Sequence, residues 1–381
     1  MYKDEQNQNV IISIKQAGTL LREAIPSTVT VMLWGPPGEG KTSLVNSVFE
    51  PDHYVWPISA GCSDPTDMGG IPDKMTGAPA FENFPPLWAF VASVDYPKWY
   101  ENNPEHRMGL PVPGPLVLFF DDVVTADEQT QASLYKSIHE RRTGRCLYRD
   151  DVRIIMAGNY MDNQSAANEM PMALGNRMLH LHVRNNGDDF VEWAVNNNLH
   201  PNIIGYIRYQ PQHLNTFQEA LNSGSKAFAT PRSWHLLSDE LKKAEKSKDL
   251  DPFIRFAAVA GMVGRGVATE YAAFERCSEG IISPTEILEN PTTVAVPDPD
   301  KLDLMHATIA ALETYVAQMP TIENLKAMMK YAIRVQVEFG ALLARSMIRV
   351  TSSRLSYEDK LAMAVDKEIA ESLEHWRKFI S

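Results

Sequence analysis

The sequence predicts an α/β fold, with a doubly wound parallel sheet in the first half of the chain and helices in the second. Three observations support this prediction. Short apolar, β-branched runs alternate with helical patterns up to about residue 185. One of these runs, residues 116–120, is apolar throughout, as expected for a strand covered on both faces. After residue 183 the strand-like runs stop and helical patterns take over.

Five strands are expected in the first half of the chain. A helix over residues 41–49 should follow the first of them. Strands that are separated by helices pair in parallel, because the chain crosses over one face of the sheet before it returns. The strands are predicted over residues 29–34, 53–58, 116–120, 152–157 and 178–183.

Residues 61–86 interrupt this alternation of strands and helices. The segment is rich in Gly and Pro, and Asp73, Lys74 and Gly77 lie between two short extended pieces. Gly and Pro favour turns, and a long loop without structure of its own is uncommon in a compact domain. We therefore expect an inserted hairpin or a long loop in this segment.

The second half of the chain is predicted to be helical. Ser356 and Asp359 have the spacing of a helix capping box, with Asp in place of Glu or Gln, and they open the last expected helix. Residues 290–300 are rich in Pro and read as a linker. Apolar residues recur at helical spacing between residues 325 and 335, which favours core packing over a groove for a partner. The helices are expected over residues 188–197, 201–206, 231–244, 321–350 and 357–379.

Length and composition are typical of a soluble globular protein with two or three domains. The chain has 381 residues, of which 44% are hydrophobic and 22% charged, and no apolar run approaches the roughly 18 residues that span a bilayer. The N-terminus is polar and acidic, unlike a signal peptide. Cys62, Cys146 and Cys277 form no Cys-x-x-Cys pair, which argues against a zinc site or a disulfide framework. A cytoplasmic protein without membrane contact is expected.

A phosphate-binding loop is the most specific motif in the chain. Residues 35–42 read Gly-Pro-Pro-Gly-Glu-Gly-Lys-Thr and lie between the first strand and its helix. The glycines let backbone N–H groups wrap phosphates, while Lys41 supplies a positive charge and Thr42 a hydroxyl ligand for Mg²⁺. The alternative is a chance match in a tight turn. ATP with Mg²⁺ is the expected ligand, bound by Gly35, Pro36, Pro37, Gly38, Glu39, Gly40, Lys41, Thr42 and Ser43.

A pair of acids is predicted to complete this site. Asp121 and Asp122 directly follow the apolar strand at residues 116–120, and acids at strand ends of a parallel sheet lie beside the phosphate loop. Asp121 would hold Mg²⁺ through water, and Asp122 would polarise the attacking water. The competing interpretation is an acid pair that caps the next helix.

With both elements in place, the sequence resembles the AAA+ ATPases of the MoxR-like branch over roughly residues 10–245. Asn159, in Ile-Ile-Met-Ala-Gly-Asn, resembles the sensor-1 residue, which would position the lytic water beside Asp122. Arg177, in Ala-Leu-Gly-Asn-Arg-Met, resembles the arginine finger that reaches the γ-phosphate of a neighbouring subunit. Arg232, in Ala-Thr-Pro-Arg-Ser-Trp, resembles the sensor-2 residue at the start of a lid helix.

Simpler explanations exist for several of these matches. Arg177 alone is also compatible with a surface helix charge, and Arg232 with an ordinary helix-capping salt bridge. The arginine-rich residues 140–153 resemble the hairpin before sensor 1, and their simplest interpretation is a solvated hairpin. A subunit interface, a pore or a nucleic-acid contact is the alternative. The segment at residues 61–86 resembles the helix-2 insert of MoxR-like proteins, which would face the pore or the client.

One residue departs from the pattern of this family. The acids after the strand are usually Asp-Glu, whereas this chain has Asp121 and Asp122. The shorter side chain ends about one methylene further from the attacking water, and water activation depends on hydrogen-bond reach. Slow but real ATP hydrolysis is therefore expected.

The resemblance also implies a domain order and an assembly. An N-terminal segment (residues 1–25) would precede an AAA+ α/β core (26–185), a helical lid (186–250) and a C-terminal helical region (251–381). An arginine finger that acts in trans implies a closed homo-oligomeric ring, most simply a hexamer.

Three functions from different classes remain open. The first is a ring-forming ATPase that remodels a protein partner, often one with a von Willebrand factor A domain. The second is a nucleic-acid-directed motor or loader, which the net charge of −12 disfavours outside residues 140–153. The third is an ATP-gated scaffold with little hydrolysis, for which Asp122 is the main argument. A bacterial or phage-infected cell is the expected setting, since residues 257–264 and 287–291 resemble phage-encoded proteins of this branch.

Overall fold

The structure is a computed structural model of the 381-residue chain. It describes residues 2–3, 9–74, 81–160, 168, 170–246, 251–278 and 280–380. Contacts divide the chain into two compact units, Met1–Asn185 (unit 1) and Asn186–Ser381 (unit 2). Each unit has hydrophobic clusters of its own, so each is described by itself.

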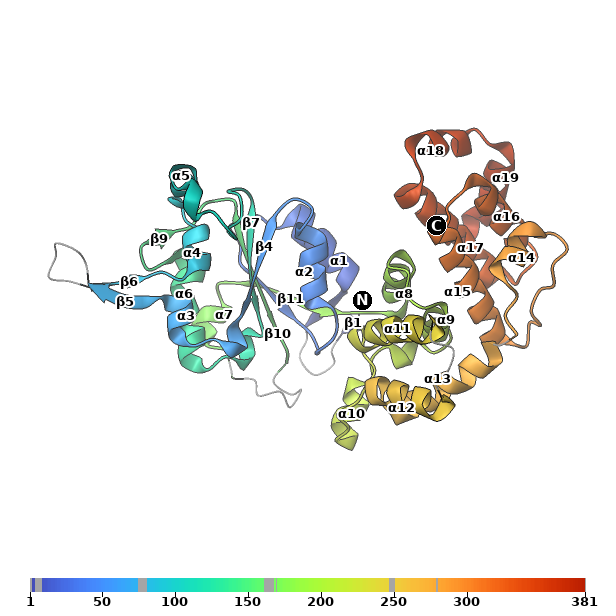
Figure 1. The fold of residues 1–381 in the computed structure, drawn as a ribbon, viewed down its shortest axis with the longest axis horizontal. Helices are drawn as coiled ribbons and strands as arrows, with labels where there is room; N and C mark the ends of the chain where they lie inside the picture. The colour runs from blue at the N-terminus through green and yellow to red at the C-terminus, as the bar shows by residue number, and fades with distance from the viewer. Residues whose placement is uncertain are drawn as a thin grey trace. The chain divides into compact units, whose positions relative to one another are not determined.

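Unit 1 is built around a seven-stranded sheet (Figure 1). The strand order is β1-β2-β11-β3-β10-β7-β4, and all neighbours are parallel except β1 and β2. The predicted parallel sheet is confirmed, whereas β1 and β2 were not predicted. The strands are β1 (Tyr2–Lys3), β2 (Val10–Ser13), β3 (Val31–Trp34), β4 (Tyr54–Ser59), β7 (Leu116–Asp121), β10 (Val152–Gly158) and β11 (Leu179–Arg184).

Helices cover both faces of this sheet. Successive residues of a strand point to opposite faces, so a strand that is apolar throughout presents apolar side chains on both. In β7, Leu118 and Phe120 belong to one buried cluster, while Val117 and Phe119 belong to the other. The predicted doubly wound arrangement is therefore confirmed. The first face carries α3 (Pro65–Gly69), α4 (Leu87–Val91), α5 (Tyr96–Asn102), α6 (Glu128–His139) and α7 (Met172–Gly175), and the second carries α1 (Ile14–Thr19) and α2 (Lys41–Phe49).

Unit 1 also contains two hairpins. β5 (Ile71–Lys74) pairs antiparallel with β6 (Phe81–Phe84), which is the hairpin predicted within residues 61–86. Residues 75–80, which include the predicted turn residue Gly77, lie outside the described part. The second, β8 (Arg142–Thr143) and β9 (Cys146–Leu147), precedes β10. Short 3-10 turns occur at Ala60–Cys62, Pro104–His106, Val123–Thr125 and Pro211–Leu214, and a π turn at Leu20–Ala24.

Unit 2 consists of helices in its described part, as predicted. One buried cluster runs from Phe190 to Trp376, so the residues expected to form a lid and those of the C-terminal region share one core. None of the helices described in either unit is long and apolar enough to cross a membrane. The helices are α8 (Gly187–Asn196), α9 (Pro201–Tyr209), α10 (Phe217–Ser223), α11 (Pro231–Lys246), α12 (Pro252–Val263), α13 (Arg265–Ser278), α14 (Pro284–Glu289), α15 (Leu302–Gln318), α16 (Ile322–Ala332), α17 (Val337–Arg354), α18 (Tyr357–Ala364) and α19 (Lys367–Ile380).

The two long C-terminal helices predicted from the sequence are each broken in two. The first break, between α16 and α17, contains Arg334, whose guanidinium donates to the carbonyls of Pro291 (2.9 Å) and Val294 (2.6 Å) in the Pro-rich linker. The second break contains Asp366, whose Oδ1 accepts the N–H of Ile369 (3.2 Å) and so caps α19. The prediction of continuous helices over residues 321–350 and 357–379 is wrong.

Candidate functional site

The loop that follows β3 is shaped by its glycines. Gly38 (φ 78°) and Gly40 (φ 96°) have left-handed backbone conformations, which residues with a Cβ rarely adopt. At Gly35 the restriction is steric, since a Cβ there would lie 2.6 Å from the carbonyl oxygen of Val183 on β11. The three glycines of the motif are therefore all required by the local geometry.

The loop leads into an open helix N-terminus. α2 begins at Lys41, and its cap residue Gly40 has no side chain that could accept hydrogen bonds from the first turn. That turn also contains no acidic residue. The first N–H groups and the positive end of the helix dipole thus remain available to an anion. Such a helix start is a favourable place for a phosphate.

Lys41 connects the loop to the neighbouring strand. Its side chain is 7% exposed, and Nζ donates to the carbonyls of Gly35 (2.8 Å) and Pro36 (3.0 Å). Nζ also donates to Oδ1 of Asn159 (2.9 Å), the residue that follows β10. Two predicted site residues that are far apart in the sequence are therefore in direct contact.

A second contact joins the start of α2 to the end of β7. The Thr42 hydroxyl donates to Oδ2 of Asp121 (2.8 Å), and the other carboxylate oxygen of Asp121 accepts the N–H of Asp122 (3.0 Å). A hydroxyl and a carboxylate are hard oxygen ligands of the kind that Mg²⁺ prefers. The residues at this position thus fit the divalent cation that accompanies a nucleoside triphosphate.

Asp122 has an unusual backbone conformation beside this contact. Its φ of 53° lies in the left-handed region, which Asp and Asn adopt more readily than longer side chains. The turn is held by Thr125, whose N–H (3.0 Å) and hydroxyl (2.7 Å) both donate to the Asp122 carbonyl. The residue is exposed, so solvent water can reach its side chain.

The loop makes one contact for which the sequence carried no signal. Glu39 is 1% exposed, and its Oε2 accepts the N–H of Asn185 (2.6 Å), the last residue of unit 1. The motif treats position 39 as variable, so only the structure reveals this contact. The phosphate loop is thereby hydrogen-bonded to the segment that leads into unit 2.

The two predicted arginines belong to different units. Arg177 follows α7, where its guanidinium lies 4.6 Å from the ring centre of Tyr135 and donates to the carbonyl of Ala173. Within the described part of unit 1 it does not contact the phosphate loop. Arg232 is exposed in the first turn of α11, in unit 2.

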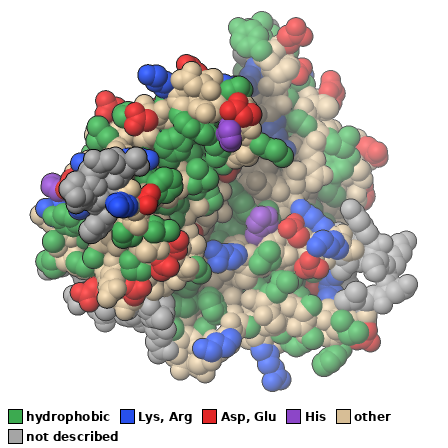
Figure 2. Space-filling model, turned by 60° about the vertical axis from the view of Figure 1, so that its left-hand side comes forward, with side chains coloured by type: hydrophobic (Ala, Val, Ile, Leu, Met, Phe, Trp, Pro, Cys, Tyr) green, Lys and Arg blue, Asp and Glu red, His purple; other side chains and the backbone are tan. Residues whose placement is uncertain are grey.

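The arginine-rich residues 140–153 contain the predicted hairpin, β8–β9, but three of their five arginines are not solvated as predicted. Arg141, Arg149 and Arg153 direct their guanidinium groups at backbone carbonyls of unit 1, at distances of 2.5 to 3.4 Å. Burial lowers the pKa of Arg141 and of Arg153. Among the arginines of this segment, only Arg142 and Arg145 are exposed. On the face shown in Figure 2, basic and acidic side chains are interspersed.

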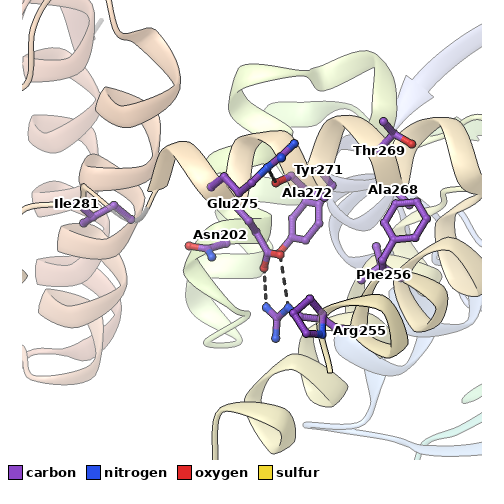
Figure 3. A pocket seen from close by; sticks show the side chains of 12 residues that line it. Asn202, Arg255, Phe256, Ala268, Thr269, Tyr271, Ala272, Glu275 and Ile281 are labelled. Atoms are coloured by element: carbon purple, nitrogen blue, oxygen red, sulfur yellow. Dashed lines mark hydrogen bonds and ion pairs between the residues drawn. The ribbon is translucent and has the colours of Figure 1, made fainter. Parts of the chain in front are cut away.

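Unit 2 contains a separate cavity of about 720 Å³ between α9, α12 and α13 (Figure 3). Its lining is mainly apolar and includes Phe256 and Tyr271. Arg255 and Glu275 form an ion pair in it (2.6 Å). None of the site residues predicted from the sequence lines this cavity.

No protein-family model matches the sequence, and no curated protein matches it. Among solved structures, the chain is similar to one described as a putative ATPase from Cytophaga hutchinsonii. The two are 14% identical, the match covers 98% of this chain and 91% of that chain, and the TM-score is 0.29. A TM-score this low supports no conclusion, so the fold assignment rests on the strand order and helix arrangement described above.

Proposed function

We propose that this chain binds and hydrolyses ATP with Mg²⁺. The observation that carries the proposal is the pair of contacts by which Lys41 meets Asn159 and Thr42 meets Asp121. These contacts lie at the carboxyl ends of adjacent parallel strands, where open α/β sheets bind their ligands. A lysine, a hydroxyl, a carboxylate and an amide at one point are the groups that phosphoryl transfer from ATP uses.

The loop and the start of α2 would bind the triphosphate. Backbone N–H groups between Gly35 and Thr42 wrap its oxygens, and Lys41 exchanges its carbonyl partners for phosphate oxygens. Thr42 and Asp121 would hold Mg²⁺, which neutralises phosphate charge when bound.

Asp122 and Asn159 would act on the attacking water. Asp122 accepts a proton from it, and Asn159, held in place by Lys41, orients it. Because the Asp side chain is short, its carboxylate reaches the water poorly and turnover is slow.

The test is Mg²⁺-dependent phosphate release by the purified full-length chain, with Lys41→Ala as the control. We expect wild-type release to exceed that of Lys41→Ala by about 100-fold or more, because an electrostatic stabiliser of the transition state is removed. Binding of a fluorescent ATP analogue should be lost in the same variant. Equal phosphate release by the two proteins, alone and with a partner, would contradict the proposed hydrolase activity. An ATP-gated scaffold would then be the remaining function.

We further propose that the chain is an AAA+ ATPase of the MoxR-like branch and acts as a ring, most simply a hexamer. Arg177 lies away from the phosphate loop of its own subunit, which supports action on a neighbouring subunit. Arg232 would contact phosphate from the helical lid. The test mixes two variants: Arg177→Ala, which has an intact phosphate loop, and Lys41→Ala, which has an intact arginine finger. Mixed rings should regain hydrolysis that neither variant shows alone, and no recovery would count against a finger in trans.

The proposed output is the remodelling of a protein partner, such as one with a von Willebrand factor A domain. Nucleic acid is a weaker candidate, because Arg141, Arg149 and Arg153 are occupied by backbone carbonyls. The experiment is capture of partners by an Asp122→Asn variant loaded with ATP. ATPase stimulation by DNA with a steep salt dependence would instead favour the nucleic-acid motor.

A further inference from the structure

Four aromatic rings stack beside the phosphate loop. Trp34, the last residue of β3, lies within 11 to 18° of parallel to Tyr160, His180 and His182. Tyr160 and His182 are parallel within 3°, and the Tyr160 hydroxyl lies 3.0 Å from Nδ1 of His182. The stack thus connects the residue before the loop, the residue after Asn159 and the strand β11.

Within this stack, His180 bridges two elements through both of its ring nitrogens. Its Nδ1 lies 2.8 Å from Nε1 of Trp34, and its Nε2 lies 2.8 Å from the carbonyl oxygen of Gly175. An indole N–H only donates and a carbonyl oxygen only accepts. Both hydrogen bonds therefore form only when Nδ1 is unprotonated and Nε2 carries the proton, which is one neutral tautomer.

The bridge joins two parts of the proposed catalytic machinery. Trp34 directly precedes Gly35 of the phosphate loop. Gly175 is the last residue of α7, and Arg177 lies two residues beyond it, with its N–H donated to the carbonyl of Leu174 (3.2 Å). The loop and the turn that carries Arg177 are thus linked through one imidazole.

We propose that His180 is a positioning residue that couples the phosphate loop to Arg177, and that protonation of its imidazole uncouples them. An imidazolium carries N–H groups on both nitrogens, so its Nδ1–H would face the Trp34 indole N–H across 2.8 Å. One hydrogen bond would be lost and two donors would oppose each other. His180 is exposed, so protons from solvent reach it.

Among the described residues, the titratable or charged groups around the stack are Tyr160 after β10, His182 on β11 and Arg177 after α7, while β3 contributes the uncharged Trp34. None of these is a carboxylate that would stabilise an imidazolium. The coupling is therefore expected with the neutral imidazole and is lost with the imidazolium, which has no acceptor for the Trp34 N–H.

The inference rests on the proposed function only for the role of Arg177, because the bridge itself is independent of nucleotide. His180→Gln is the informative variant, since its amide oxygen accepts from Trp34 and its amide nitrogen donates to Gly175 without titrating. From pH 8.0 to pH 6.0 we expect the hydrolysis rate of the wild type to fall more than that of His180→Gln. The ratio of the two decreases should be about five to ten, because the wild type loses one hydrogen bond. His106→Gln, at an exposed histidine paired with Glu105, should follow the wild type.

The bridge is tested separately by NMR of the full-length chain labelled with ¹⁵N-histidine. The His180 signal, assigned by its absence from His180→Gln, should show the neutral Nε2–H tautomer at pH 8.0. The Nδ1–H tautomer or an imidazolium at that pH would overturn the bridge. Equal pH profiles of wild type and His180→Gln would overturn the coupling. If the chain hydrolyses no ATP at either pH, the proposed function fails, while the tautomer still decides whether His180 bridges Trp34 and Gly175.

Discussion

At the residue scale, Asp122 combines a chemical role with a backbone restriction. The turn after β7 places it in the left-handed region, fixed by two hydrogen bonds from Thr125 to its carbonyl. Asp and Asn are the non-glycine residues that tolerate this conformation best. The short carboxylate at this position is therefore matched to its turn, although a longer side chain would reach further.

Asp122→Asn should separate chemistry from folding. Asn keeps the left-handed conformation, so the free energy of unfolding should change by less than about 0.5 kcal/mol. Phosphate release should fall by roughly 100-fold, because the amide cannot accept a proton from water. Both quantities are measured on the same preparation by urea unfolding and a phosphate assay. Wild-type release by Asp122→Asn would show that another group accepts the proton.

Asp122→Glu tests whether reach limits the rate. The added methylene brings the carboxylate nearer to the water, so we expect phosphate release to rise several-fold. The left-handed backbone should make the variant about 1 kcal/mol less stable, since Glu tolerates that region poorly. A higher rate with lower stability would support both parts of the explanation. An unchanged rate would indicate that the orientation of the turn, rather than side-chain length, limits hydrolysis.

Much of the proposed site could be predicted from the sequence because its residues belong to local motifs. Lys41 and Thr42 follow a glycine pattern, and Asp121 follows an apolar strand. The contacts of Glu39 with Asn185 and of His180 with Trp34 link residues that are 146 positions apart. Neither belongs to a local pattern, so neither could be predicted without the fold.

At the element scale, strands were easier to predict than helices. β3 and β7 are apolar runs, and their predicted bounds lie within two residues of the observed ones. α15 (Leu302–Gln318) was missed because Ala307, Thr308, Ile309 and Ala310 are all buried, so no amphipathic period marks it. The break before α17 was missed because Arg334 is held by carbonyls about 40 residues away, a tertiary contact without a local signal.

Two glycines in helices of unit 2 provide a matched test of the packing. A Cβ on Gly340 of α17 would lie 2.2 Å from the ring of Trp376, which is 2% exposed, and 2.5 Å from the carbonyl oxygen of Ala332. Gly340→Ala should therefore lower the free energy of unfolding by about 2 kcal/mol. Gly261 of α12 has nothing within 4 Å of its Cβ position, so Gly261→Ala should raise it by about 0.5 kcal/mol.

The measurement is urea unfolding of the full-length variants, followed by the signal of unit 2. Opposite signs for Gly340→Ala and Gly261→Ala would confirm that α17 packs closely against Trp376. If both variants gained stability, as helix propensity alone predicts, the close approach of α17 and α19 would be contradicted.

At the scale of the whole molecule, unit 1 and unit 2 have separate cores joined through Asn185 and Asn186. Two cores allow two unfolding transitions. A ligand that binds only the folded state stabilises the unit that holds its site. ATP should therefore move the transition of unit 1, which identifies that transition by experiment.

The other transition should respond to acid through His306 on α15. Burial, with a smaller contribution from Arg208, lowers the pKa of His306 from 6.5 to about 4, and its Nδ1 has no hydrogen-bond partner among the described residues. The unfolded chain then binds the proton that the folded unit does not, so stability is lost as pH falls from about 6.5 to about 4. The shift corresponds to about 3 kcal/mol. The ATP-insensitive transition should lose this amount in the wild type and much less in His306→Phe, whose ring can keep the contact with Phe339. An equal loss in His306→Phe would assign the acid sensitivity to other groups of unit 2.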